Sequence, residues 1–203
     1  MSFVMTEIES FLNSDLILNK PLSYKSHAIQ IGHHFMHYLD EGQGPVVILL
    51  HGNPTWCYYY RSLIEKLKTK FRVLVPDYIG CGLSSNRSDQ TFRAAHRVEH
   101  LQEFIRSLNL DKYSLVMHDW GGSLGTSLAL SNVAAVDRLV YLNTTLTETE
   151  SLPKIIKAAA QPFIGKLLTK YSRRFLKFTT EWGVCKKLPK EIKKAYYYPY
   201  QSI

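Results

Sequence analysis

The stretch SLVMHDWGGSLG, residues 114–125, decides the fold of this chain. Its first four residues form a short apolar run of the kind that fills a central parallel strand. The small residues of 121–125 allow a helix to begin close against that strand. The pattern therefore predicts a buried strand, a tight turn and a helix, with Asp119 presented at the turn.

Such a strand, turn and helix resemble the nucleophile elbow, written G-x-S-x-G, whose middle side chain stands beside the N–H groups that begin the helix. Here the five positions are MHDWG, residues 117–121, so Asp119 occupies the place of the Ser. A carboxylate is ionised at neutral pH, needs no base before it attacks, and can form a covalent ester. The alternative is that Asp119 only caps the helix, which is a common use of Asp.

Two other loops follow strand-like runs. Residues 45–50, PVVILL, precede HGNPTW at 51–56, and the loop after such a strand supplies an oxyanion-hole N–H beside the nucleophile. We therefore expect Asn53 to face Asp119. Residues 73–84, VLVPDYIGCGLS, pass from a strand into a loop, where we expect Asp77 to shape the loop through side-chain to backbone hydrogen bonds rather than to act as a catalytic acid.

The order of elements along the chain predicts an α/β class. Residues 23–31 and 34–39 are expected to form two outer strands, and residues 91–108 carry the apolar spacing of an amphipathic helix. Four further strands separated by helices make a mostly parallel sheet. Ligands of such sheets bind at the carboxyl ends of the strands, where the 51–56 and 118–125 motifs both fall.

The motifs HGNPTW at 51–56, PDYIGCGLS at 76–84 and HDWGGSLG at 118–125, in this order and at these intervals, resemble those of haloalkane dehalogenases of the α/β-hydrolase superfamily. The resemblance implies an α/β-hydrolase fold, a mostly parallel sheet flanked by helices with a helical cap. It implies Asp119 as the nucleophile, and the side chains of Asn53 and Trp120 as N–H donors to the departing halide. Asn amides and Trp indoles are both donors, which suits the stabilisation of a leaving anion.

A second group fits nearly as well. The run WCYYYR at 56–61, together with Leu142-Asn143-Thr144, resembles the β-lactone decarboxylases of long-chain olefin biosynthesis, which share the dehalogenase motifs. In that reading Asp119 attacks a β-lactone, and the products are an alkene and carbon dioxide. Some dehalogenases carry their catalytic acid where this chain has Asn143, so the chain is more similar to the branches whose acid comes one strand later. An apolar small molecule, haloalkane or β-lactone, is the expected substrate.

The chain departs from this family pattern after Asp119. The fold's triad runs in the order nucleophile, acid, histidine. The eight histidines are residues 27, 33, 34, 37, 51, 96, 100 and 118, so none follows the nucleophile. We expect the C-terminal strands and last helix of the fold to be missing, either because the chain is a fragment or because the gene product is truncated. A non-catalytic remnant that binds small molecules or a partner protein is then the alternative function.

Charge divides the chain into two parts. Residues 151–203 hold 12 basic and 2 acidic side chains, or +10, whereas residues 1–150 hold 13 basic and 15 acidic ones, or −2. We predict an α/β-hydrolase core over 1–147 and a partial helical cap over 148–203. A solvated lysine surface is the simpler reading of the basic region, and weak contact with an anionic membrane surface is the alternative. No motif supports nucleic-acid binding.

The remaining composition indicates a cytoplasmic protein without a cofactor or metal. Three cysteines, Cys57, Cys81 and Cys185, are odd in number and lack metal-ligand spacing, which favours reduced thiols. The N-terminus carries Glu7 and Glu9 rather than a basic lead into an apolar run. No stretch approaches the roughly 18 apolar residues of a membrane helix.

Overall fold

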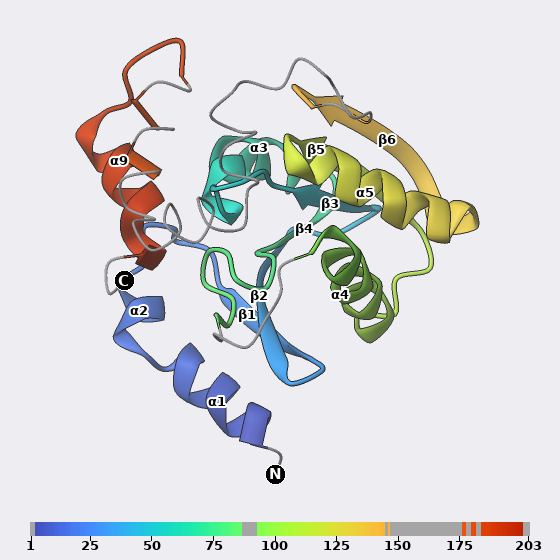
Figure 1. Ribbon diagram of the computed structural model, residues 1–203, viewed down its shortest axis with the longest axis horizontal. Coiled ribbons are helices and arrows are strands. Elements are labelled where there is room, and N and C mark those ends of the chain that lie inside the picture. Colours follow the sequence, from blue (N-terminus) through green and yellow to red (C-terminus); the bar gives the residue numbers. More distant parts are fainter. Residues whose placement is uncertain are drawn as a thin grey trace. The chain divides into compact units, whose positions relative to one another are not determined.

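A computed structural model describes residues 3–86, 93–144, 146, 176, 177, 180, 181 and 184–200 (Figure 1). The chain divides into two compact units, residues 1–146 and 147–203. Most of the predicted cap, including all of 147–175, lies outside the described residues, so the cap stays a prediction.

The first unit is built on a sheet whose described strands run in the order β1-β2-β4-β3-β5-β6. The pairs β1 with β2 and β2 with β4 are antiparallel, and the other three pairs are parallel. The two outer strands and the mostly parallel sheet predicted from the sequence are thus confirmed. The strands are β1 (Ser26–Ile31), β2 (His34–Glu41), β3 (Val46–Leu50), β4 (Arg72–Pro76), β5 (Tyr113–His118) and β6 (Val136–Leu142).

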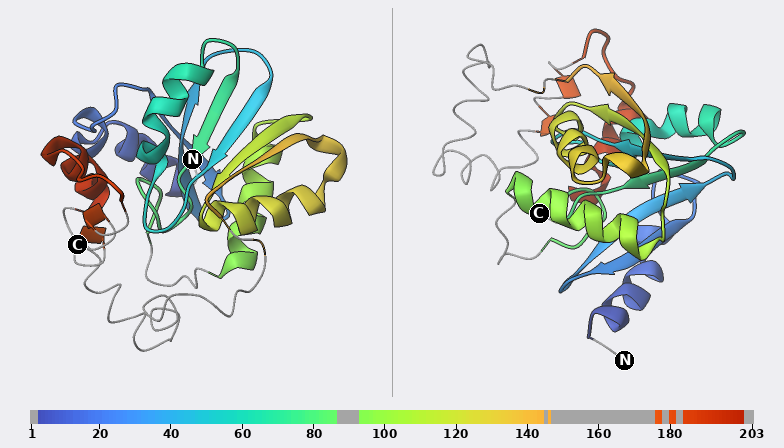
Figure 2. Two further views of the ribbon diagram at one scale, coloured as in Figure 1. Left: turned by 90° about the horizontal axis from the view of Figure 1, so that it is seen from above. Right: turned by 90° about the vertical axis from the view of Figure 1, so that its right-hand side faces the viewer.

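Helices cover both faces of this sheet. Figure 2 shows α4 and α5 on one face and α3 on the other. The predicted helix of 91–108 is observed as α4, while Thr91 and Phe92 lie outside the described residues. The helices of the first unit are α1 (Phe3–Leu12), α2 (Asp15–Leu18), α3 (Arg61–Leu67), α4 (Ala94–Ser107) and α5 (Trp120–Ser131), with short 3-10 turns η1 (Cys57–Tyr60) and η2 (Val133–Ala135).

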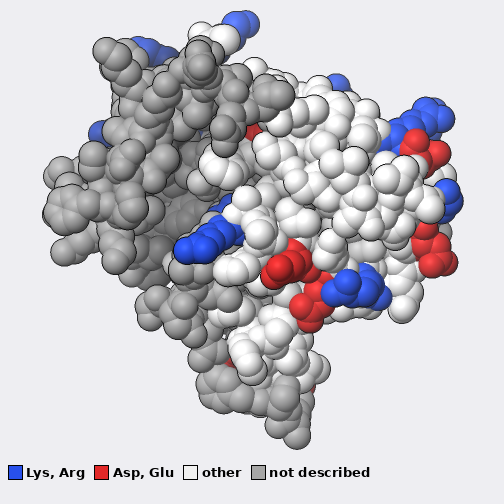
Figure 3. Space-filling view, turned by 45° about the vertical axis from the view of Figure 1, so that its right-hand side comes forward, with Lys and Arg blue, Asp and Glu red and all other residues white. Residues whose placement is uncertain are grey.

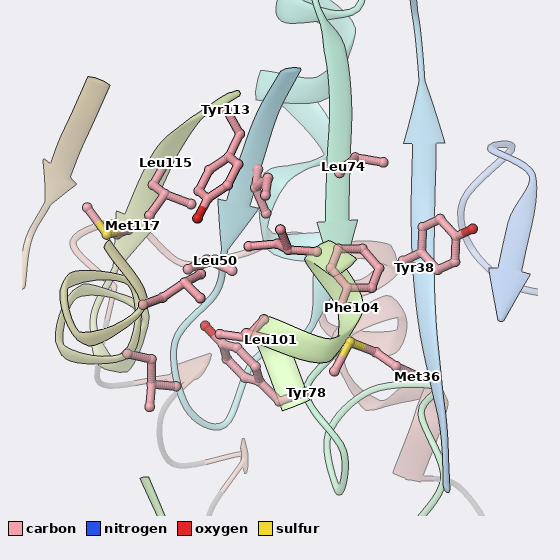
Figure 4. Close-up of a cluster of buried hydrophobic side chains, with 14 of the residues drawn as sticks. Met36, Tyr38, Leu50, Leu74, Tyr78, Leu101, Phe104, Tyr113, Leu115 and Met117 are labelled. Carbon is pink, nitrogen blue, oxygen red and sulfur yellow. The ribbon is translucent and has the colours of Figure 1, made fainter. Parts of the chain in front are cut away.

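The core lies between the sheet and the α4 and α5 helices (Figure 4). Phe104 of α4 is fully buried and packs edge-on against Tyr38 of β2, with ring centroids 5.2 Å apart. Burial of one such side chain contributes roughly 1.5–3 kcal/mol. Leu50 of β3 and Met117 of β5 are register partners and are both fully buried. This packing fixes the carboxyl ends of the two strands side by side.

Strand β6 ends the sheet in the described part of the chain, and its side chains are mostly exposed. Leu139, Val140, Tyr141 and Leu142 each expose 37–42% of their surface. Figure 3, which brings the α4, α5 and β6 side of the molecule forward, shows a broad area without charged side chains. An apolar strand at a sheet edge is a surface onto which further chain can pack or aggregate.

The described part of the second unit contains helix α9 (Lys190–Tyr197) and the 3-10 turn η3 (Tyr198–Tyr200). The Thr180 hydroxyl lies 2.7 Å from the Tyr197 hydroxyl, and the Lys193 amine lies 3.7 Å from a Glu181 carboxylate oxygen. Within the described residues of both units, no helix is both long enough and apolar enough to cross a bilayer.

Candidate active site

Asp119 occupies the turn between β5 and α5, as the sequence predicts. Its backbone has φ 53° and ψ −123°, a region that costs a non-glycine residue on the order of 1–3 kcal/mol. The helix begins so close to β3 that a Cβ atom at Gly121 would overlap the Leu50 carbonyl oxygen. The Asp119 carbonyl accepts hydrogen bonds from the Thr144 hydroxyl at 2.6 Å and from the Gly122 N–H at 3.0 Å. These bonds help to hold the strained turn.

The side chain of Asp119 does not cap the helix. Although the residue stands at the N-cap position of α5, it makes no side-chain hydrogen bond to the helix. Instead, Oδ1 of Asp119 accepts the backbone N–H of Asn53 at 2.9 Å. Gly52 presses against the same carboxyl group, and a Cβ atom there would lie 2.6 Å from Oδ1. The capping reading is therefore wrong, and the carboxylate faces the 51–56 loop.

Asn53 faces Asp119, as predicted, through its main chain. Its side chain is exposed. Trp120 is the first residue of α5, and 48% of its surface is exposed. The structure thus places both predicted leaving-group donors next to Asp119 in the fold. Their side-chain roles toward a halide stay a prediction.

The hydrogen bond from Thr144 to Asp119 was not predicted from the sequence. Thr144 follows β6, whose carboxyl end lies beside that of β5 because the two strands are parallel, with His118 opposite Leu142. Asn143, in the position where some relatives carry an acid, has a positive φ of 42° at the end of the strand. The only sequence signal for Thr144 was the resemblance of residues 142–144 to the decarboxylases.

Asp77 shapes its loop, as expected. It is fully buried, and its carboxylate accepts the backbone N–H groups of Cys57 at 2.6 Å and Leu83 at 3.0 Å. Burial alone raises the pKa of Asp77, but its interactions with His37, with His51 and with the Leu83 N–H together outweigh burial, so the pKa lies below its usual value. His37, Cys57 and Asp77 bring potential metal-ligand atoms within 4.8 Å of one another. Because Asp77 and both His37 ring nitrogens already have hydrogen-bond partners, this buried group is poorly suited to a metal.

The two histidines nearest Asp119, His51 and His118, contact other residues. His51 is fully buried; its Nδ1 donates to the Gly52 carbonyl at 2.8 Å, and its Nε2 accepts the Tyr78 N–H at 3.4 Å. His118 stacks on Tyr59 with ring centroids 4.4 Å apart. Burial lowers the pKa of both rings, against smaller opposing effects of nearby carboxylates. Within the described part of the chain, neither ring forms a hydrogen bond with the Asp119 carboxylate.

These lowered pKa values predict that the free energy of unfolding decreases as the pH is lowered. An unfolded histidine takes up a proton near pH 6.5, but folded His51 and His118 resist protonation. The unfolded state therefore binds more protons below about pH 6.5, and the free energy of unfolding is highest above that pH and falls as the pH drops. Urea unfolding at pH 5 to 8 measures this trend, and His118→Gln should flatten it. Stability that rises toward pH 5 would contradict the prediction.

Comparison with known proteins agrees with this geometry. The α/β hydrolase fold family matches residues 45–198. A cis-3-alkyl-4-alkyloxetan-2-one decarboxylase of Shewanella oneidensis is 35% identical over 193 aligned residues, covering 92% of this chain and 61% of that protein. Haloalkane dehalogenase 2 of Mycobacterium tuberculosis is 38% identical over 117 residues, covering 58% of this chain and 41% of that protein.

A solved structure shows the same fold. The haloalkane dehalogenase from Agrobacterium tumefaciens C58 matches with a TM-score of 0.80 at 24% identity, covering 87% of this chain and 62% of that one. The chain spans about 60% of the length of the curated decarboxylases that it matches. Its mostly parallel sheet flanked by helices agrees with these matches. The chain belongs to the α/β hydrolase fold family, and within it is similar to haloalkane dehalogenases and to cis-3-alkyl-4-alkyloxetan-2-one decarboxylases.

Proposed function

We propose that Asp119 is the nucleophile of a haloalkane dehalogenase-like hydrolase and forms a covalent aspartyl ester with an apolar small molecule. The observation that carries the proposal is the orientation of the carboxylate, which turns away from its own helix toward the Asn53 N–H. A carboxylate oxygen attacks the carbon that bears the halogen, and the halide leaves. Asn53 and Trp120 donate hydrogen bonds to that halide through their side chains.

Decarboxylation of a β-lactone is the second candidate. The match over 92% of this chain to a cis-3-alkyl-4-alkyloxetan-2-one decarboxylase favours it. An oxetan-2-one is a four-membered lactone ring, and the ring in that name carries two alkyl substituents. Asp119 is the nucleophile in both candidates, and the substrate is apolar in both. They differ in the bond that Asp119 breaks. In the first case it is the carbon–halogen bond, and the halide leaves. In the second it is the ring C–O bond of the lactone, and the freed carboxylate is then lost as carbon dioxide while the bond to Asp119 breaks and the alkene forms.

We further propose that the protein works in the cytoplasm. The three cysteines are free, with Cys57 and Cys81 buried, as expected for a cytoplasmic protein. We place the exposed lysines of the second unit, such as Lys190 and Lys194 on one face of α9, in solvent or in weak contact with an anionic membrane surface. Neither nucleic acid nor a cofactor has a part in the proposed chemistry.

Incubation with two substrates separates the candidates. A primary bromoalkane and a cis-3,4-dialkyl β-lactone of equal chain length are supplied separately, and bromide and carbon dioxide are measured. The dehalogenase proposal predicts bromide release with the first substrate. Carbon dioxide from the lactone with no bromide from the haloalkane would favour the decarboxylase instead. Binding of either substrate without product would indicate the non-catalytic alternative.

A further inference from the structure

A buried relay of hydrogen bonds links the outer hairpin of the sheet to the loops around Asp119. The Ser26 hydroxyl on β1 lies 2.8 Å from Nε2 of His37 on β2, and Nδ1 of His37 lies 2.9 Å from Oδ2 of Asp77, just after β4. His37 and Asp77 are fully buried, and Ser26 exposes 7% of its surface. The proposed chemistry uses none of these three side chains.

The protonation pattern of the relay follows from its donors. Asp77 accepts the N–H groups of Cys57 and Leu83 and lies against Nδ1 of His37, a set that suits a carboxylate anion. We therefore assign the His37 proton to Nδ1. Nε2 then accepts the hydroxyl proton of Ser26. Every member has a partner, which is the condition for a buried polar network to hold its geometry.

The relay reaches both ends of the loop that faces the nucleophile. At the far end, Asp77 Oδ1 holds the N–H of Cys57, where η1 begins. At the near end, the N–H of Tyr78, the residue that directly follows Asp77, donates to Nε2 of His51 at 3.4 Å, and Nδ1 of His51 donates to the Gly52 carbonyl at 2.8 Å. Asn53, between these two anchors, donates its N–H to Asp119.

We infer that Ser26, His37 and Asp77 are positioning residues that set the contact between the Asn53 N–H and the Asp119 carboxylate. They act through the main chain of residues 51–57 and touch neither substrate nor nucleophile. The significance of this contact for catalysis rests on the proposed function of Asp119. The contact itself does not, because it is present in the chain without a substrate.

The variants Ser26→Ala and Asp77→Asn test the inference. The first removes the partner of His37 Nε2 and leaves that nitrogen buried and unbonded. The second keeps the shape of the side chain but turns an NH₂ group toward N–H donors. Ile31→Val is the matched control, because Ile31 is buried in the same β1 strand and lies outside the relay.

The readout is the amide proton of Asn53 in the ¹H–¹⁵N NMR spectrum, identified as the resonance lost from its position in Asp119→Asn. We expect it to move upfield in both relay variants, and its exchange with solvent to become on the order of tenfold faster relative to the Leu49 amide. The control should leave both quantities unchanged. If the relay only stabilises the fold, the melting temperature falls while the Asn53 resonance and its relative exchange stay as in the wild type. That result overturns the inference, and Ser26→Ala decides it alone if Asp77→Asn does not fold.

Discussion

Replacing Asp119 by Asn should abolish covalent labelling of this chain by a reactive primary bromoalkane. In the wild type, the carboxylate displaces bromide and gains one alkyl group as an ester, which adds the alkyl mass to the intact protein. The Asn side chain keeps the shape of the turn but is a far weaker nucleophile. Intact-protein mass spectrometry measures the adduct, and peptide mapping locates it within the 113–131 region.

The exposed thiol of Cys185 requires a Cys185→Ser background, because it could take up the reagent itself. Cys57 and Cys81 can remain, since burial raises the pKa of both thiols and removes them from the reagent. Asp111→Asn is the matched control, because Asp111 is an exposed acid that precedes β5. Equal labelling of the Asp119→Asn chain would exclude Asp119 as the nucleophile.

The ester is expected to persist once it forms. Its hydrolysis needs a base that activates water, and every histidine of the chain lies at or before residue 118. His51 is committed to the Gly52 carbonyl, and His118 is stacked on Tyr59. We therefore expect bromide release to stop near one equivalent per chain. Sustained release over many equivalents, with contaminating enzyme excluded, would show that these 203 residues contain a working base.

Local patterns in the sequence predicted the parts of the site that are close in the chain. The apolar run before Asp119 and the small residues after it predict the turn because each acts on its immediate neighbours. The position of Asn53 was also predictable, because β3 and β5 are parallel neighbours whose carboxyl ends must meet. Family resemblance, rather than any pattern of spacing, supplied the side-chain roles of Asn53 and Trp120.

Contacts between distant residues were harder to predict. The partner of Asp77 on β2 is 40 residues away, and the hydroxyl that holds the Asp119 carbonyl is 25 residues away. Neither His37 nor Thr144 has a local signal, because many residues could occupy a buried position on β2 or the loop after β6. Their partners became visible only when the strand order and register were known.

Trp120→Phe should slow bromide release by about 10²–10³-fold if the indole N–H stabilises the leaving halide. The substitution keeps an aromatic ring at the first residue of α5 and removes only the donor. Because negative charge grows on the halogen as its bond to carbon breaks, a donor aimed at that atom lowers the barrier more than it favours the bound substrate. Single-turnover bromide release at saturating bromoalkane measures this step.

Trp56→Phe is the matched control for this substitution. Trp56 is fully buried, stacks on Tyr58, and its indole nitrogen has no hydrogen-bond partner within the described residues. Removing an N–H that bonds to nothing should leave the rate within about threefold, because no interaction with the leaving group is lost. Unchanged bromide release in Trp120→Phe would remove the halide role of the indole. An equal loss in both variants would trace the effect to the packing of aromatic rings, since only a donor that meets the developing anion distinguishes Trp120 from Trp56.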